Sequence, residues 1–278
     1  MDRLKSLYWR ARHKKIPAYL HIPKTGGTYL TQWESDSRPV LSPMRYIGHY
    51  YVADHEEDLN PLYQGYDPDN ARRTVIRKSE LADNVVFATA RNPFSWLVSY
   101  ASHAGGWNPR YANTEHYDYA NASRGFDYML KVIANREDLW PNRKFIHCQL
   151  FSSGGDLIID RLNRNETLDD DLAEMAASLK IRYRTRPRQR VGGLNDYRQY
   201  YTDALIDLVS VTWGRELRLF GYDFGSYNLD NAVMKKDISP EQKAKIVYSW
   251  KEDRLVIAGN RIPRENRIGA AEIGTCKE

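Results

Sequence analysis

The 278-residue sequence is poor in cysteine and has no long uninterrupted run of apolar residues. Its two cysteines, Cys148 and Cys276, are too far apart in the chain to indicate a metal cluster or a disulfide framework, which favours a reducing compartment. No segment is apolar over the length needed to cross a membrane, and the N-terminus lacks the apolar core of a signal peptide. We therefore expect a cytoplasmic protein without a transmembrane segment.

The sequence also lacks the Gly-x-x-x-x-Gly-Lys-Ser/Thr motif of Walker nucleotide-binding loops. Instead, an apolar run at 16–22 leads into residues 23–28, Pro-Lys-Thr-Gly-Gly-Thr, which we call the Lys24 loop. Helix-compatible sequence follows from 26 to about 34. Such a strand–loop–helix unit presents backbone N–H groups and a lysine to a phosphate. Because Lys24 stands at the start of the turn, it is expected to meet the bound group from a different side than a Walker lysine does.

No strong excess of either charge is present: 41 Lys and Arg against 36 Asp and Glu give a formal net charge of +5. This balance favours anionic partners without distinguishing a nucleotide, an acidic glycan and a nucleic acid. The arginine-rich segment 182–190 fits a solvated loop, a basic lid over an anionic ligand, or a nucleic-acid patch. Since no RNA-binding signature accompanies it, we expect no nucleic-acid partner.

Alternating strand and helix patterns predict one α/β domain over residues 1–278, with a P-loop-like parallel β-sheet flanked by helices. Strands are expected at 16–22, 84–90 and 157–162. Besides the helix after the Lys24 loop, helices are expected at 126–134 and at 201–219. Another is expected to follow the segment 164–172 and to end at residue 179. A basic amphipathic helix is expected at 1–15, and a polar C-terminal appendage at about 227–278.

A second strand–helix junction follows the apolar run 84–90. Arg91 comes directly after this run, Asn92 can cap the next helix, and Pro93 can occupy its first turn. Ser95 and Ser99 are then one turn apart on the same helix face. A phosphate at this junction would meet an arginine and a hydroxyl together.

At these two junctions the chain resembles the sulfotransferases that use 3′-phosphoadenosine 5′-phosphosulfate (PAPS). The Lys24 loop is similar to their 5′-phosphosulfate loop, and Arg91 with Ser99 is similar to their 3′-phosphate pair. Residues 190–202, Arg-Val-Gly-Gly-Leu-Asn-Asp-Tyr-Arg-Gln-Tyr-Tyr-Thr, resemble a third family segment, with Val191 and Asn195 departing from the usual pattern. Residues 164–168, Arg-Asn-Glu-Thr-Leu, resemble an element that links a core strand to a helix.

The resemblance implies transfer of a sulfuryl group from PAPS to a hydroxyl by in-line displacement, with 3′,5′-adenosine bisphosphate (PAP) as product and no metal. Lys24 would neutralise the charge that develops on the leaving oxygen. The donor-binding residues implied are Lys24, Thr25, Gly26, Gly27, Thr28, Arg91, Ser99, Arg190 and Gly192. The match is closer to the carbohydrate, heparan-sulfate-type branch than to the phenol and steroid branch, so the expected acceptor is a sugar or a small molecule.

Such a transfer needs a general base for the acceptor hydroxyl, and an imidazole suits this task. His49 is the leading candidate, because Gly48-His49 resembles a segment after the donor loop of heparan-sulfate-type enzymes. The alternatives are His55, His103, His116, Glu56 and Glu80. His21, on the strand before the loop, is expected either to be packed there or to support the residues that contact the ligand, and His147 is expected to lie in the core.

The loop between residues 104 and 124 is rich in aromatic side chains. Its candidate acceptor-binding residues are Trp107, Tyr111, His116 and Tyr117. Aromatic rings in such a loop can stack on a sugar, or they can anchor the loop itself, and the sequence is compatible with both roles.

Two other functions are compatible with the sequence: a P-loop nucleotide-dependent kinase, and a non-catalytic relative that binds an anionic ligand. The displaced lysine and the lack of an apolar strand ending in a magnesium-binding Asp count against the kinase. The presence of Lys24 together with His49 counts against a non-catalytic relative.

Overall fold

The structure of the chain is a computed structural model. The residues that the structure describes are 15–31, 40–48, 51–55, 75–104, 129–130, 133–134, 146–185, 196–228, 230–252, 254–257 and 260–261. The basic helix expected at 1–15 lies outside these residues apart from residue 15, and four residues of the helix expected at 126–134 are described, all helical.

Four parallel strands form the central sheet, in the order β3-β1-β6-β7. Their bounds are β3 (Arg45–Gly48), β1 (Ile16–Leu20), β6 (Asn84–Ala90) and β7 (Arg161–Arg164). The two inner strands, β1 and β6, are buried along most of their length, as expected for parallel strands covered on both faces. The predicted α/β fold with a parallel sheet is confirmed.

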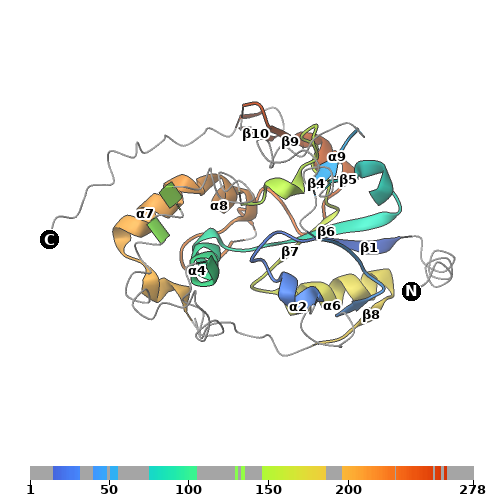
Figure 1. Ribbon diagram of the computed structural model, residues 1–278, viewed down its shortest axis with the longest axis horizontal. Coiled ribbons are helices and arrows are strands. Elements are labelled where there is room, and N and C mark those ends of the chain that lie inside the picture. Colours follow the sequence, from blue (N-terminus) through green and yellow to red (C-terminus); the bar gives the residue numbers. More distant parts are fainter. Residues whose placement is uncertain are drawn as a thin grey trace.

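Helices cover both faces of this sheet (Figure 1). On one face, α2 (Gly27–Thr31) and α6 (Leu168–Leu179) contribute apolar side chains to a buried cluster with Tyr19 and Phe87. On the other face, α4 (Pro93–Ala104), α7 (Asp203–Thr212) and α8 (Gly214–Phe220) contribute to a larger cluster with Leu20 and Ala88. Successive residues of β1 and β6 therefore serve opposite cores, as strand geometry requires.

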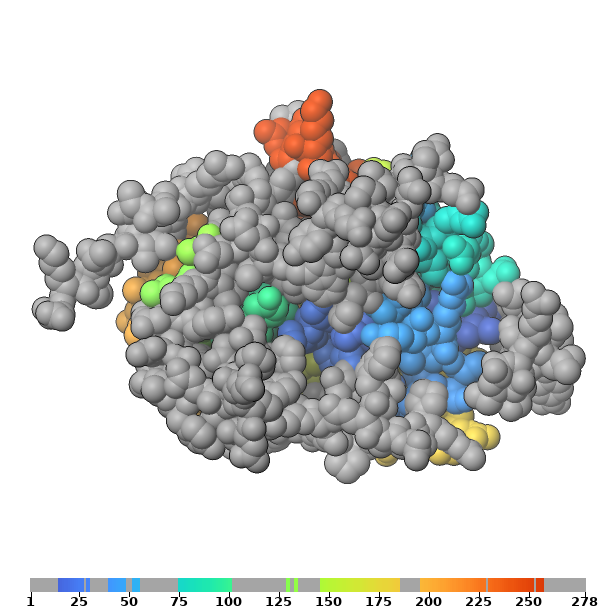
Figure 2. All heavy atoms as spheres, viewed as in Figure 1, coloured from blue at the N-terminus to red at the C-terminus, as the bar shows by residue number. Residues whose placement is uncertain are grey.

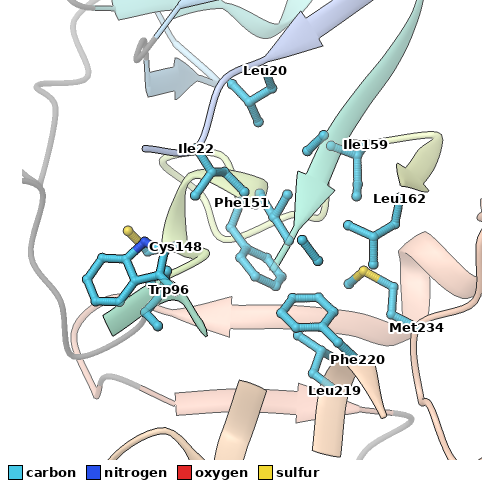
Figure 3. Packing of buried hydrophobic residues seen from close by; sticks show 14 of the residues in the cluster. Leu20, Ile22, Trp96, Cys148, Phe151, Ile159, Leu162, Leu219, Phe220 and Met234 are labelled. Atoms are coloured by element: carbon cyan, nitrogen blue, oxygen red, sulfur yellow. The ribbon is translucent and has the colours of Figure 1, made fainter. Parts of the chain in front are cut away.

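The larger cluster extends from the end of β1 to the C-terminal part of the chain. Figure 3 shows Ile22, Trp96, Phe220 and Met234 among its members, and all four are at most 1% exposed. The expected polar appendage contains α9 (Pro240–Lys245) and an antiparallel sheet of β9 (Ile246–Ser249), β10 (Arg254–Ile257) and β11 (Asn260–Arg261). Buried apolar residues of this segment join the same core, and its β9–β10 region projects at the top of the space-filling view (Figure 2).

Two predicted elements differ from those observed. The strand expected at 157–162 lies at Arg161–Arg164, because residues 157–159 are buried in the core without joining the sheet. The single helix expected at 201–219 is two helices, α7 and α8, which meet at the fully buried Trp213. In both places an apolar pattern signals burial correctly but leaves the backbone conformation open.

Short elements complete the described part of the chain. They are β2 (Leu41–Ser42), β4 (Tyr51–Ala53), β5 (Val75–Arg77), η2 (Lys78–Leu81), η5 (Cys148–Leu150), β8 (Arg182–Tyr183) and η7 (Tyr197–Tyr200). β2 pairs with β8 in antiparallel fashion, and β4 pairs with β5 in parallel. Within the described ranges, no helix combines the length and apolarity that crossing a membrane requires.

Candidate functional site

The candidate site lies at the carboxyl edge of the central sheet. Because the four strands are parallel, the segments that follow them emerge on the same edge, where open α/β sheets bind ligands. β1 leads into the Lys24 loop, β6 leads to Arg91, and β7 leads to Asn165. The strand pairing places the C-terminal ends of these strands side by side, since Leu20 pairs with Ala88 on β6 and Ala90 pairs with the last residue of β7.

The Lys24 loop turns sharply through two residues with positive φ. Lys24 has φ 65° and Gly26 has φ 107°. The buried Thr25 hydroxyl donates a hydrogen bond to the Ile22 carbonyl at 2.7 Å, which closes the turn on itself. A left-handed conformation is ordinary for glycine but costly for lysine, so Lys24 stands in a backbone conformation that most residues avoid.

Arg91 joins the first two motifs directly. Its Nη1 donates to the Lys24 carbonyl at 2.9 Å, although the two residues are 67 positions apart. Its Nε donates to Ser95 Oγ at 2.9 Å, one turn into α4. The Trp96 indole, also on α4, donates to the Pro23 carbonyl at 3.0 Å. The Lys24 loop is therefore held against the start of α4, and Figure 2 shows atoms of residues 15–31 beside those of α4.

These contacts place two cations in one partly desolvated region. Burial, and secondarily the charge of Arg91, lower the pKa of Lys24 from 10.5 to about 8. Among the residues that the structure describes, no carboxylate forms an ion pair with the Lys24 ammonium. A buried lysine next to an arginine is electrostatically unfavourable until an anion binds between or beside them. The arrangement can therefore bind a phosphate or sulfate group.

A third junction, between β7 and α6, packs against the Lys24 loop. The Asn165 backbone N–H donates to the Ala90 carbonyl at 2.8 Å, and its side chain lies against Gly26, where an added Cβ would be 3.1 Å from Nδ2. Glu166 accepts hydrogen bonds from the Asn92 backbone N–H at 3.2 Å and from the Tyr222 hydroxyl at 2.8 Å. The 164–168 element therefore links β7 to α6, as expected, and also braces both neighbouring loops.

The third family-like segment is described only from residue 196 onward, and this part packs on α4. The Tyr201 hydroxyl donates to the Phe94 carbonyl at 2.7 Å, and the Thr202 hydroxyl caps α7 by accepting from the Leu205 N–H at 3.3 Å. Phe94, Tyr201 and Phe224 meet edge to face in the same region. The described part of this segment therefore packs against the helix that begins beside Arg91.

The structure brings together the Lys24 loop and Arg91, and it places the half-buried Ser99 on α4, the helix that follows Arg91. Among the described contacts, the hydroxyl that meets Arg91 is that of Ser95, one turn before Ser99. Thr28 is described in its backbone as part of α2. The predicted residues that lie outside the described residues are His49, Trp107, Tyr111, His116, Tyr117, Arg190 and Gly192.

The alternative bases fall in different places. Glu80 is exposed and pairs with Arg45 at the start of β3, which puts it at the amino edge of the sheet, opposite the site. His55 follows β4 and is exposed. His103 lies on α4 without a described side chain, and Glu56 lies outside the described residues.

Sequence reasoning missed several residues that shape the site. Asn165 and Trp96 hold the Lys24 loop through the contacts above, and the buried His147 accepts from the Arg91 N–H through Nε2 at 3.5 Å. The 164–168 pattern could have pointed to Asn165, since it follows a core strand. Nothing local marks Trp96 or His147, because their contacts depend on how distant segments pack.

Comparison of the chain with protein-family models, with curated proteins and with solved structures found no match.

Proposed function

We propose that the protein is a PAPS-dependent sulfotransferase. The observation that carries this proposal is the contact between Arg91 and the Lys24 loop, with the Lys24 ammonium partly desolvated beside it. A loop with two glycines, a lysine and an adjacent arginine at the carboxyl edge of a parallel sheet suits an anionic nucleotide. The resemblance of the sequence motifs to sulfotransferases supports PAPS as that nucleotide.

In this proposal the residues of the site divide into two groups. Lys24 and the backbone of residues 25–28 hold the 5′-phosphosulfate end. Arg91 and Ser99 hold the 3′-phosphate, with Arg190 and Gly192 from the third segment. The two hydrogen bonds to Ser95 and to the Lys24 carbonyl orient the Arg91 guanidinium, which has five N–H donors in a fixed plane.

The donor supplies a sulfuryl group on a phosphate oxygen. The acceptor oxygen forms a bond to sulfur as the bond from sulfur to the bridging phosphate oxygen breaks, and the acceptor proton passes to a base. Lys24 neutralises the negative charge that collects on the leaving phosphate oxygen, which is where a preorganised cation lowers the barrier most.

His49 is the proposed base. It is the next residue after Gly48, and Gly48 ends β3 at the same sheet edge, where its carbonyl accepts from the His21 N–H at 2.9 Å. The acceptor in this proposal is a sugar or a small-molecule alcohol, with Trp107, Tyr111, His116 and Tyr117 as candidate contacts. A cytoplasmic location belongs to the same proposal.

The first test is calorimetric titration with 3′,5′-adenosine bisphosphate, 5′-AMP and magnesium-ATP. A 3′-phosphate clamp requires the bisphosphate to bind at least about tenfold more tightly than 5′-AMP, because a charge-assisted contact is worth that much. Preference for magnesium-ATP would instead favour a P-loop kinase. Binding of none of the three would leave a non-catalytic relative with another anionic ligand.

A further inference from the structure

His21 lies between the end of β1 and the Lys24 loop, and two strands fix its ring. Its Nδ1 is 2.6 Å from the Tyr46 hydroxyl oxygen on β3. The imidazole also stacks on the Tyr19 ring of β1, with ring centroids 5.6 Å apart. A side chain held by a hydrogen bond on one side and a ring stack on another has little rotational freedom.

The far side of the imidazole lies against Gly27. A Cβ added to Gly27 would come within 1.8 Å of His21 Nε2 and 2.1 Å of Cε1. Among the described residues the glycines with positive φ are Gly26, Gly48, Gly155 and Gly221, so Gly27 has a backbone that any residue can adopt. Glycine is required at this position because the His21 ring occupies the space of its side chain.

We propose that His21 is a positioning residue for the anion site. Its ring, oriented by Tyr46, sets where the backbone of Gly27 lies and so aims the loop N–H groups at the bound phosphate. This inference rests on the proposed function, because it assigns His21 a role in donor binding. It also explains why the loop has two consecutive glycines with different requirements: backbone conformation at Gly26, and space for an imidazole at Gly27.

A simple packing role would make different predictions. If His21 only filled space, its removal would lower thermal stability and leave the affinity of the folded protein for the donor nearly unchanged. If His21 positions the loop, loss of the ring weakens donor binding even at temperatures where the protein is fully folded. Adding a methyl group at Gly27 is harmful only while the ring is there.

The experiment is a double-mutant cycle with Gly27→Ala, His21→Ala and the double variant. The dissociation constant of 3′,5′-adenosine bisphosphate is measured by calorimetry, and the melting temperature is measured without ligand. Gly27→Ala should weaken binding by about tenfold or more, since overpacking of a buried contact has a cost of that size. The double variant should bind more tightly than Gly27→Ala, because His21→Ala makes room for the new methyl group.

Tyr46→Phe tests the orienting bond without removing the ring. It should weaken bisphosphate binding while leaving the melting temperature close to that of Tyr183→Phe, a control that loses a comparable 2.9 Å bond to Asp169. If the wild-type protein binds the bisphosphate but the losses of binding free energy in the cycle are additive, the positioning role of His21 is overturned and the proposed function is not. Failure of the wild-type protein to bind the bisphosphate would overturn the proposed function and this inference with it.

Discussion

Replacing Lys24 by methionine should stabilise the folded protein while abolishing its activity. The folded-state pKa of Lys24 is about 8 against an ordinary 10.5, so the folded state binds this proton less tightly than the unfolded chain does. At about 1.4 kcal/mol per pKa unit, and allowing for partial exposure, the charged lysine lowers the free energy of unfolding by about 2–3 kcal/mol at pH 7. Methionine has a similar length and no charge, so it should recover most of that amount.

The size of this effect, but not its sign, changes with pH in a defined window. Below pH 8 the lysine is protonated in both states, and the full cost is present. As pH rises from 8 towards 10.5, the folded state loses the proton first and the cost disappears. The gain from Lys24→Met should therefore be large at pH 7 and small at pH 10, as urea unfolding at the two pH values would measure.

Lys180 provides a matched control for this substitution. Lys24 and Lys180 are the two described non-glycine residues with positive φ, but Lys180 is exposed at the C-terminal cap of α6. Lys180→Met should change the free energy of unfolding by no more than about 0.5 kcal/mol. If Lys24→Met instead destabilised the protein at pH 7 by more than Lys180→Met does, Lys24 would be a structural lysine and the reasoning would be refuted.

Three further predictions concern the donor and the base. Arg91→Ala should weaken binding of 3′,5′-adenosine bisphosphate by at least about tenfold in calorimetry, and unchanged affinity would contradict the clamp. Bisphosphate affinity should be nearly constant between about pH 7 and pH 8, where the phosphates of the ligand are already ionised. Above pH 8 it should fall by up to about tenfold per pH unit, since the bound anion requires protonated Lys24; a flat profile in wild-type protein, or a slope kept in Lys24→Met, would count against that link. His49→Ala should abolish sulfuryl transfer from PAPS with bisphosphate affinity intact, and near-normal turnover would move the base elsewhere.

The sequence predicted well those helices and strands in which the spacing of apolar residues follows from burial along a regular backbone. The run 84–90 is β6 over its whole length, and Asn92 caps α4 through a bond from the Phe94 N–H to Oδ1 at 3.1 Å. The helix expected to end at Leu179 does so. In each case the local signal and the tertiary environment agree, which is the condition under which pattern reasoning succeeds.

The predicted boundaries of helices and strands were wrong where a contact with a distant part of the chain accompanies a change in backbone conformation. The break between α7 and α8 falls at Trp213, whose ring meets Trp96 edge to face at 5.7 Å. Nothing in residues 201–219 identifies Trp96 as that partner. Similarly, a sequence pattern can indicate that Arg91 and the Lys24 loop each follow a strand, but the bond between them depends on β1 and β6 being neighbours.

Lys24 combines two unfavourable features that packing alone would not retain. Its backbone has φ 65°, a conformation for which glycine is the favoured residue, and its ammonium is largely withdrawn from water next to Arg91. Either feature would be relieved by a glycine or by a neutral side chain. Strained and desolvated residues of this kind concentrate at sites where function requires them. In the proposed function an anion bound beside Arg91 accounts for this lysine, because it would turn an unfavourable charge into a stabilising one.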